Sequence, residues 1–291
     1  MGKVYDYLEL VRIPGVFTAH ADITAGFLIA GGGIEQIGCA AYLLLASSFL
    51  YSAGMALNDY FDYQIDLKER PKRPIPSGRI KRQEALCLGI LLLAAGIFAS
   101  YYVRPASFII SLLLVALILL YNMGLKKNPW LGPVNMGGCR YLNLLLGLSV
   151  LPLSTGSFMV PLLTGIFIFG VTVLSSQETK VEASFFPVLV SAGSIAAVYA
   201  LYWLFFITDI LSQKPGLILC TLWAILLLVC LLRLIGKRSA GDIQKAVKLL
   251  IISLVLLDGI MVSGIRAIYW PLLVWILLVP AVITSKKFYI T

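Results

Sequence analysis

A group of oxygen-bearing side chains lies where the second long apolar segment, residues 38–57, ends. Asn58 is followed by Asp59, Asp62 and Asp66, in a chain with only 14 acidic residues. In a continuous helix the three aspartates share one face and repel one another. A hard cation removes that repulsion, and Mg²⁺ combines a few carboxylates with substrate phosphate oxygens. The pattern predicts a site where these four residues hold Mg²⁺ on a diphosphate; a solvated helix end is the alternative.

The composition places this group in a membrane protein. Of the 291 residues, 60% are hydrophobic and 13% are charged, whereas soluble domains carry about 25% charged residues. Most of the chain is therefore expected to span the bilayer as helices, because lipid offers no partners to open backbone groups. The single histidine and five cysteines without CxxC spacing argue against a zinc or haem site.

The apolar segments predict an all-α bundle of nine to ten transmembrane helices in a single domain, residues 1–291. The last two segments are closely spaced, which leaves nine spans as the alternative to ten. The segments are 16–31, 38–57, 85–103, 105–121, 140–155, 158–176, 186–207, 216–235, 245–264 and 268–284.

The basic residues predict the orientation of the bundle. With a cytoplasmic N-terminus and ten crossings, all of the 23 Lys and Arg residues except Arg104, Lys214 and Arg266 fall on the cytoplasmic side. This asymmetry follows the positive-inside rule. It predicts a multi-pass protein of a bacterial inner membrane, with the acidic group facing the cytoplasm. It also explains the net charge of +9 without a nucleic-acid partner.

Two polar loops near the acidic group supply cations for a diphosphate. Loop 67–84 is rich in proline and basic residues, and arginine can bind phosphate oxygens through two hydrogen bonds. Loop 122–139 begins just after a tyrosine and contains a lysine that could hold the leaving diphosphate. A loop that only marks the cytoplasmic side is the alternative for the first. The candidate substrate contacts are Arg70, Lys72, Arg73, Arg79, Tyr121 and Lys126.

Polar residues within or at the ends of predicted helices complete the set of candidates. Asp22, Arg140 and Asn143 are expected to face the bundle interior, since lipid penalises them. They are assigned to substrate binding, and an interhelical hydrogen bond is the alternative for Asp22. Glu178 and Glu182 are spaced i, i+4. They could hold a second Mg²⁺ opposite the first acidic group, or lie in a solvated loop.

The pattern from Asn58 to Asp66 resembles the first aspartate motif of the UbiA superfamily of intramembrane prenyltransferases. The run from Arg70 to Gly78 is similar to that family's basic cap loop, and Tyr121 with Lys126 is similar to its tyrosine–lysine pair. Four features are most similar to the EboC-like branch, namely Arg12-Ile13-Pro14, Asp22, the run from Leu131 to Asn143, and Lys286-Lys287-Phe288-Tyr289.

The resemblance implies a bundle around a central cavity with a cytoplasmic cap. It also implies Mg²⁺-dependent transfer of an isoprenoid from a prenyl diphosphate to an aromatic, quinone-like or other lipid acceptor, with Asp59, Asp62, Asp66 and Lys126 as catalytic residues. The family's second motif is commonly rich in aspartate, whereas this chain has glutamates. A non-catalytic membrane subunit of a transport or assembly pathway and an intramembrane terpene cyclase are therefore the alternatives.

The charge asymmetry makes the topology testable. We expect a Lys72→Cys variant in intact cells to resist a membrane-impermeant thiol reagent, because loop 67–84 is predicted to lie inside. Ready labelling from outside would overturn the orientation and the cytoplasmic position of the site.

Overall fold

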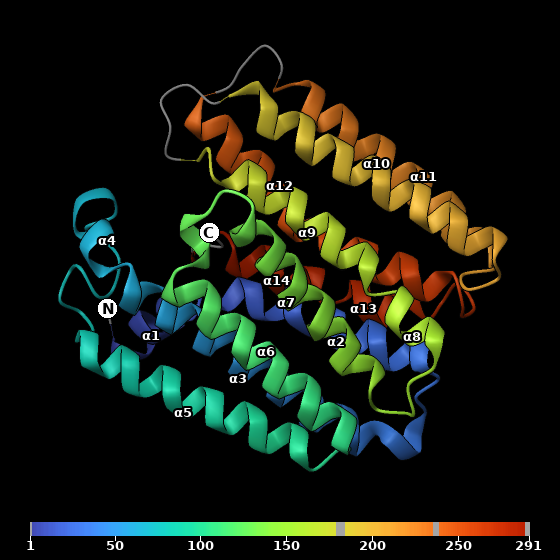
Figure 1. The fold of residues 1–291 in the computed structure, drawn as a ribbon, viewed down its shortest axis with the longest axis horizontal. Helices are drawn as coiled ribbons and strands as arrows, with labels where there is room; N and C mark the ends of the chain where they lie inside the picture. The colour runs from blue at the N-terminus through green and yellow to red at the C-terminus, as the bar shows by residue number, and fades with distance from the viewer. Residues whose placement is uncertain (1, 179–183, 235–238, 289–291) are drawn as a thin grey trace.

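The computed structural model describes residues 2–178, 184–234 and 239–288, and within these ranges it is helical, with no strand (Figure 1). The elements in chain order are α1 (Lys3–Leu10), α2 (Ile13–Ala30), η1 (Ile34–Gln36), α3 (Ile37–Phe61), α4 (Tyr63–Glu69), α5 (Arg82–Tyr101), α6 (Pro105–Met123), η2 (Leu125–Lys127), α7 (Leu131–Leu148), α8 (Thr155–Met159), α9 (Leu162–Ser175), α10 (Phe185–Ile207), α11 (Lys214–Leu232), α12 (Ala240–Ser263), α13 (Pro271–Trp275) and α14 (Leu278–Thr284).

Eight helical segments in the described ranges are long and apolar enough to cross a membrane, which confirms the predicted polytopic bundle. They are α2, η1–α3, α5, α6, α8–α9, α10, α11 and α12. Helix α7 and the pair α13–α14 account for the other two predicted segments. The last predicted segment is not one helix, because α13 ends at Trp275 and α14 starts at Leu278.

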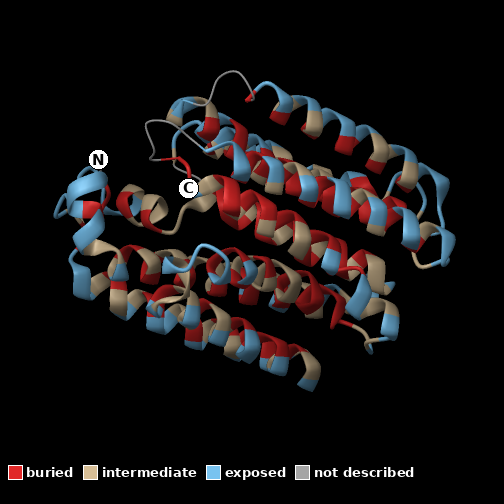
Figure 2. Cartoon of the chain, turned by 45° about the horizontal axis from the view of Figure 1, so that its top comes forward, coloured by how far each residue is buried: buried red, intermediate tan, exposed pale blue. Residues whose placement is uncertain are grey.

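The helices differ in how far they are buried (Figure 2). The most apolar stretch of α12 is 72% buried and that of α2 is 61% buried, whereas the value for α5, α6 and α11 is 33%. Outer helices therefore turn apolar side chains outwards, as expected where lipid is the solvent. Asp22 of α2 and Asp258 of α12 are enclosed by protein instead.

The helix does not continue unbroken through the three aspartates, because α3 ends at Phe61 and α4 begins at Tyr63. Asp62 lies between them. The guanidinium of Arg82 donates from Nε to the Tyr60 carbonyl at 3.2 Å. This outside donor satisfies a carbonyl that the next helical turn would otherwise use. The break lets Asp62 point in a different direction from its neighbours.

The predicted polar loop 122–139 is partly wrong, because α7 begins at Leu131. The side chain of Asn128 accepts hydrogen bonds from the backbone N–H groups of Trp130 and Leu131, at 2.9 and 3.0 Å. Those groups have no partner within a helix, so an oxygen placed there favours a helical start. Pro133 fits within the first turn for the same reason.

Two glycines allow α2 and α7 to approach closely. A Cβ atom on Gly26 would lie 2.6 Å from the Leu144 carbonyl oxygen, and one on Gly147 would lie 2.6 Å from the Ile23 carbonyl oxygen. Small residues permit such contacts between membrane helices. The close approach brings the polar side chains of α2 within hydrogen-bonding distance of α7.

We expect Gly26→Ala to destabilise the protein by about 1–3 kcal/mol, because the added methyl group overlaps the backbone of α7. Gly193→Ala is the matched control, since nothing lies within 4 Å of a Cβ atom at that position of α10. There alanine should be neutral or stabilise the helix by up to about 1 kcal/mol. Thermal unfolding in detergent measures both variants, and equal effects would contradict the tight α2–α7 contact.

Candidate active site

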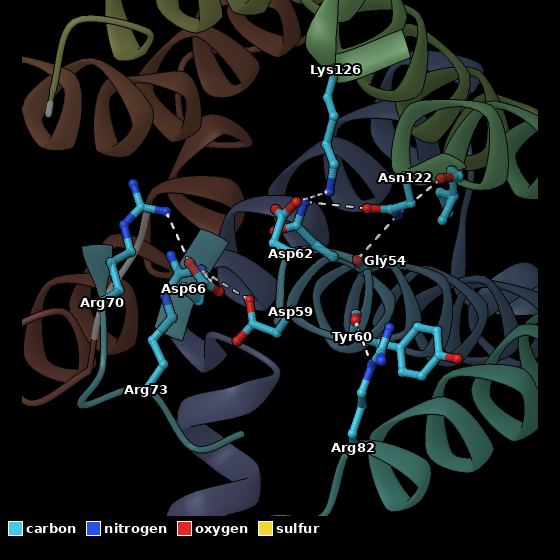
Figure 3. A network of polar contacts seen from close by, with 12 residues as sticks. Gly54, Asp59, Tyr60, Asp62, Asp66, Arg70, Arg73, Arg82, Asn122 and Lys126 are labelled. Carbon is cyan, nitrogen blue, oxygen red and sulfur yellow. Dashed lines mark hydrogen bonds and ion pairs between the residues drawn. The ribbon is translucent and has the colours of Figure 1, made fainter. Parts of the chain in front are cut away.

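Arg73 lies between two of the predicted carboxylates (Figure 3). Its Nη1 atom donates to Asp59 Oδ1 at 3.2 Å and to Asp66 Oδ2 at 2.9 Å. All three residues are buried, with exposed fractions of 8% for Arg73, 2% for Asp59 and 1% for Asp66. Asp59 comes from the end of α3, Asp66 from α4, and Arg73 from the segment that joins α4 to α5. The two aspartates therefore converge on one cationic atom of the protein itself.

Arg12 is a second cation on the same cluster, and the sequence analysis did not assign it to the site. Its Nη2 atom lies 3.2 Å from Asp59 Oδ1. The residue joins α1 to α2 in the left-handed backbone region, with φ of 50°. That conformation is uncommon outside glycine and asparagine, and tertiary contacts must maintain it. The signal available in the sequence was a basic residue two positions before Pro14.

Asp62 belongs to a separate group with Asn58 and Lys126. The Lys126 ammonium lies 2.6 Å from Asp62 Oδ1. With its amide turned, Asn58 donates to Asp62 Oδ2 at 3.2 Å and accepts from Lys126 at 3.3 Å. Asn122, which was not predicted, lies against Asn58 and donates to the Ile118 carbonyl at 2.9 Å. The structure thus brings Asn58, Asp62 and Lys126 together.

Two predicted contacts lie elsewhere. Arg79 donates to Asp6 at 2.6 Å and to Glu9 at 2.7 Å, both on α1. The hydrogen bonds that Arg79 donates to Glu9 raise the pKa of Arg79 above its ordinary value. Arg79 and Lys72 line a separate cleft of about 920 Å³ against α1 and the C-terminal segment. The structure therefore places these two side chains apart from Asp59 and Asp66, because α1 supplies acids that bind Arg79. Their contact with the diphosphate stays a prediction.

Most of the remaining candidates border one cavity of about 530 Å³, but the buried side chain of Asp59 does not line it. Its polar end is lined by both groups of cations and acids, including Arg70, whose Nη1 lies 3.9 Å from Asp66 Oδ1. Tyr121 and Glu178 line the same cavity. Glu182 lies outside the described residues. The rest of the wall is largely apolar and includes Leu50, Leu114, Ile118, Ile168, Val171 and Ile251.

Arg140 and Asn143 form a deeper polar group with Asp22, which confirms the alternative of an interhelical hydrogen bond. Asp22 Oδ2 accepts from Arg140 Nη1 at 3.0 Å and from Asn143 Nδ2 at 2.8 Å. Thr18 accepts from Arg140 Nη2 at 2.8 Å. Arg140 and Asn143 also line the cavity, whereas Asp22 is completely buried. The guanidinium lies 5.7 Å from the ring centroid of Tyr51, within cation–π range.

Burial and charge oppose each other in the outer cluster. Burial raises the pKa of Asp66 above its ordinary value, and the charge of Arg73 acts in the opposite direction. Burial lowers the pKa of Arg73, and the neighbouring charge of Arg12 lowers it further. The cluster is therefore stable only while acids and guanidinium groups stay together.

The donor set suits Mg²⁺, although no three acidic, histidine or cysteine side chains are grouped as metal ligands in the described residues. The fit rests on the convergence of Asp59 and Asp66 on one positively charged nitrogen. Carboxylate oxygens that stabilise a cation at one point are the ligands that Mg²⁺ prefers. Arg73 would have to give up that position.

The model of the family described as "UbiA prenyltransferase family" matches residues 22–255. A digeranylgeranylglyceryl phosphate synthase of Methanosarcina barkeri is 33% identical over 160 residues, which is 51% of this chain and 55% of the relative. The chain spans about half the length of the curated relatives it matches.

Solved structures are similar over most of the chain. A structure described as digeranylgeranylglyceryl phosphate synthase in membranes matches with a TM-score of 0.69 and 25% identity, covering 91% of this chain and 99% of that one. A UbiA homolog from Archaeoglobus fulgidus bound to DMAPP and Mg²⁺ matches with a TM-score of 0.61 and 16% identity, covering 90% and 100%. At 16% identity the second match shows a similar fold and nothing more.

We expect Arg73→Met to destabilise the metal-free protein by about 3 kcal/mol, because two buried carboxylates lose their shared cation. The pKa of Asp66 should then rise further. An acid whose pKa is raised in the folded state stabilises that state at low pH and loses the contribution as pH rises above its ordinary value, here 3.8. The loss of unfolding free energy in Arg73→Met, relative to the wild type, should therefore be larger at pH 8 than at pH 5.

Unfolding in detergent with a chelator, at both pH values, measures this deficit. Arg70→Met is the matched control, because the Arg70 side chain is 38% exposed and its ion pair is long. Such a pair contributes at most about 1 kcal/mol. Equal losses in the two variants would contradict the role of Arg73 in charge balance.

Proposed function

The chain belongs to the UbiA prenyltransferase family, and we propose that this integral multi-pass membrane protein transfers an isoprenoid from a prenyl diphosphate to a lipophilic acceptor. The observation that carries the proposal is the cavity itself. One end combines acids and cations, and the rest is largely apolar. A prenyl diphosphate has the same division, with a charged head and a hydrocarbon tail.

At the polar end, Asp59, Asp62 and Asp66, with Asn58, would hold Mg²⁺, which neutralises charge on the departing diphosphate when bound. Glu178 and Glu182 would hold a second ion. The choice of Mg²⁺ follows the metal named for a UbiA homolog of the same fold, which was solved with DMAPP and Mg²⁺. Arg70, Arg73 and Lys126 would bind diphosphate oxygens.

The reaction breaks the bond between the allylic carbon and the diphosphate oxygen. The electron pair leaves with the diphosphate, and a lone pair or π electrons of the acceptor form the new bond to carbon, with loss of a proton from the acceptor. Lys126 and Arg73 would stabilise the charge that develops on the leaving oxygen. The rings of Tyr51 and Tyr121 in the cavity wall would favour positive charge on the allylic carbon.

The acceptor would lie next to Arg140 and Asn143, which supply hydrogen-bond donors deeper in the cavity. The curated relatives are named for a glycerol phosphate lipid product, which favours a phosphate-bearing lipid acceptor over a quinone-like one. An anionic or hydroxyl headgroup would accept hydrogen bonds from the guanidinium group of Arg140. The resemblance to the EboC-like branch stays a prediction beside these names.

The site is proposed to face the cytoplasm, as the distribution of basic residues predicts. The bacterial inner membrane stays a prediction, since the named relatives are archaeal. A non-catalytic subunit and a terpene cyclase are the competing functions. The reason for testing them is that this chain has glutamates where the family's second motif commonly has aspartates.

The test is pyrophosphate release by the purified protein with a panel of prenyl diphosphates, with and without glycerol phosphate lipids and quinol-like acceptors. Product that needs the acceptor supports the transferase. Product from the diphosphate alone would identify a cyclase. No release across the panel would favour the non-catalytic subunit.

We expect the double variant Glu178→Gln/Glu182→Gln to release pyrophosphate at least about 100-fold more slowly, because a Lewis-acid contribution of several kcal/mol is lost. Binding of the diphosphate should weaken much less, since the first aspartate group is intact. Glu35→Gln is the matched control, because Glu35 is exposed and lies in η1, beside the end of α3 that is opposite the aspartates. Equal rates in the double variant and the wild type would rule out a second metal at these residues.

A further inference from the structure

A buried carboxyl outside the site described above lies on α12. Asp258 is completely buried, and its neighbours Leu254, Val255 and Leu257 are buried as well. No N–H or O–H group of the described residues hydrogen-bonds to either of its carboxyl oxygens. An ionised carboxylate in such a place would lack both water and donors, which is a large free-energy cost within a membrane bundle.

The group that interacts with Asp258 is another acid. Helix α12 packs against α2, which brings the carboxyl group of Asp258 near that of Asp22, and the charge of Arg140 acts on both. The Oδ2 atom of Asp22 accepts two hydrogen bonds, from Arg140 and Asn143. Its Oδ1 atom is buried and has no donor in the described part of the chain. Two ionised acids beside one guanidinium would leave an excess negative charge.

We infer that Asp258 is a protonated carboxylic acid that donates its O–H to Oδ1 of Asp22 and thereby positions Arg140 and Asn143 in the cavity wall. One proton removes the excess charge, because Asp22 then balances Arg140 and Asp258 is neutral. The same proton supplies the missing donor to Oδ1 of Asp22. A carboxylate held by three donors has a fixed orientation, and it fixes the groups that donate to it.

The hydrogen bond also connects two parts of the bundle. Asp258 lies on α12, Asp22 on α2, and Arg140 and Asn143 on α7. Ser47 of α3 donates to Asn143 Oδ1 at 2.8 Å, so the chain of contacts crosses four helices. Asp258 does not line the cavity, whereas Arg140 and Asn143 do. Asp258 is thus a positioning residue that acts through Asp22, and its effect on turnover rests on the proposed function.

Infrared spectroscopy tests the protonation state without any turnover. The wild-type protein in detergent or lipid should show the C=O stretching band of a protonated carboxylic acid at neutral pH, and Asp258→Asn should lose it. Asp209→Asn is the matched control. Asp209 is exposed, and asparagine tolerates its left-handed backbone, so this variant should keep the band.

Kinetics and binding then test the positioning. Asp258→Asn keeps an N–H donor for Asp22, so its acceptor KM should stay within about threefold of the wild type. Asp258→Leu removes the donor at similar size, and its acceptor KM should rise about tenfold or more. The kcat value at saturating acceptor should change by less than about threefold in both. Rescue by asparagine separates positioning from general loss of structure, which would lower kcat in both variants.

Each result bears on the inference separately from the proposed function. Absence of the wild-type band, or its persistence in Asp258→Asn, would overturn the protonated state. An asparagine variant as impaired as the leucine variant would overturn the donor role. A wild-type protein that has the band but no transferase activity would sustain the protonated Asp258 and overturn the proposed function instead.

Discussion

The structure depends on the pairing of Asp59, Asp62 and Asp66 with positive charges supplied by the protein. Acids at a membrane boundary repel one another and are poorly solvated, so the bundle needs cations to keep them together. Arg12 and Arg73 form ion pairs with Asp59, and Arg73 also forms one with Asp66. Lys126 forms an ion pair with Asp62. The two contacts of Arg73 attach the segment between α4 and α5 to both helices that carry these aspartates.

This pairing has a consequence for ligand binding. A divalent cation that entered alone would displace Arg73 from two carboxylates and leave a buried guanidinium without a partner. A diphosphate that entered alone would bring negative charge next to acids that are already balanced. When both enter together, the acids exchange a guanidinium for the metal, and the guanidinium exchanges a carboxylate for phosphate oxygens. Charge balance therefore favours binding of the metal and the diphosphate as one unit.

Much of this arrangement could be predicted from the sequence because it depends on local spacing and composition. The apolar segments predicted the helical bundle. The run from Asn58 to Asp66 predicted that acidic side chains gather where the second segment ends. Contacts between distant segments were harder. Arg79 pairs with Asp6 and Glu9 of α1, a contact between segments about 70 residues apart. Arg12 reaches the site through an unusual backbone angle that no sequence pattern indicates. Asp258 acquires its role only from the packing of α12 on α2.

The two polar groups of the cavity differ in how their charges are balanced. The outer group uses long side chains from a turn-rich segment, and these can change partners when a charged substrate arrives. The inner group is enclosed by helices that touch at glycines, so its charges are fixed by packing. A transferase needs both properties, because the departing diphosphate changes the charge at one end while the acceptor must keep its orientation at the other. An apolar wall between the groups would also exclude water from the allylic carbon during transfer.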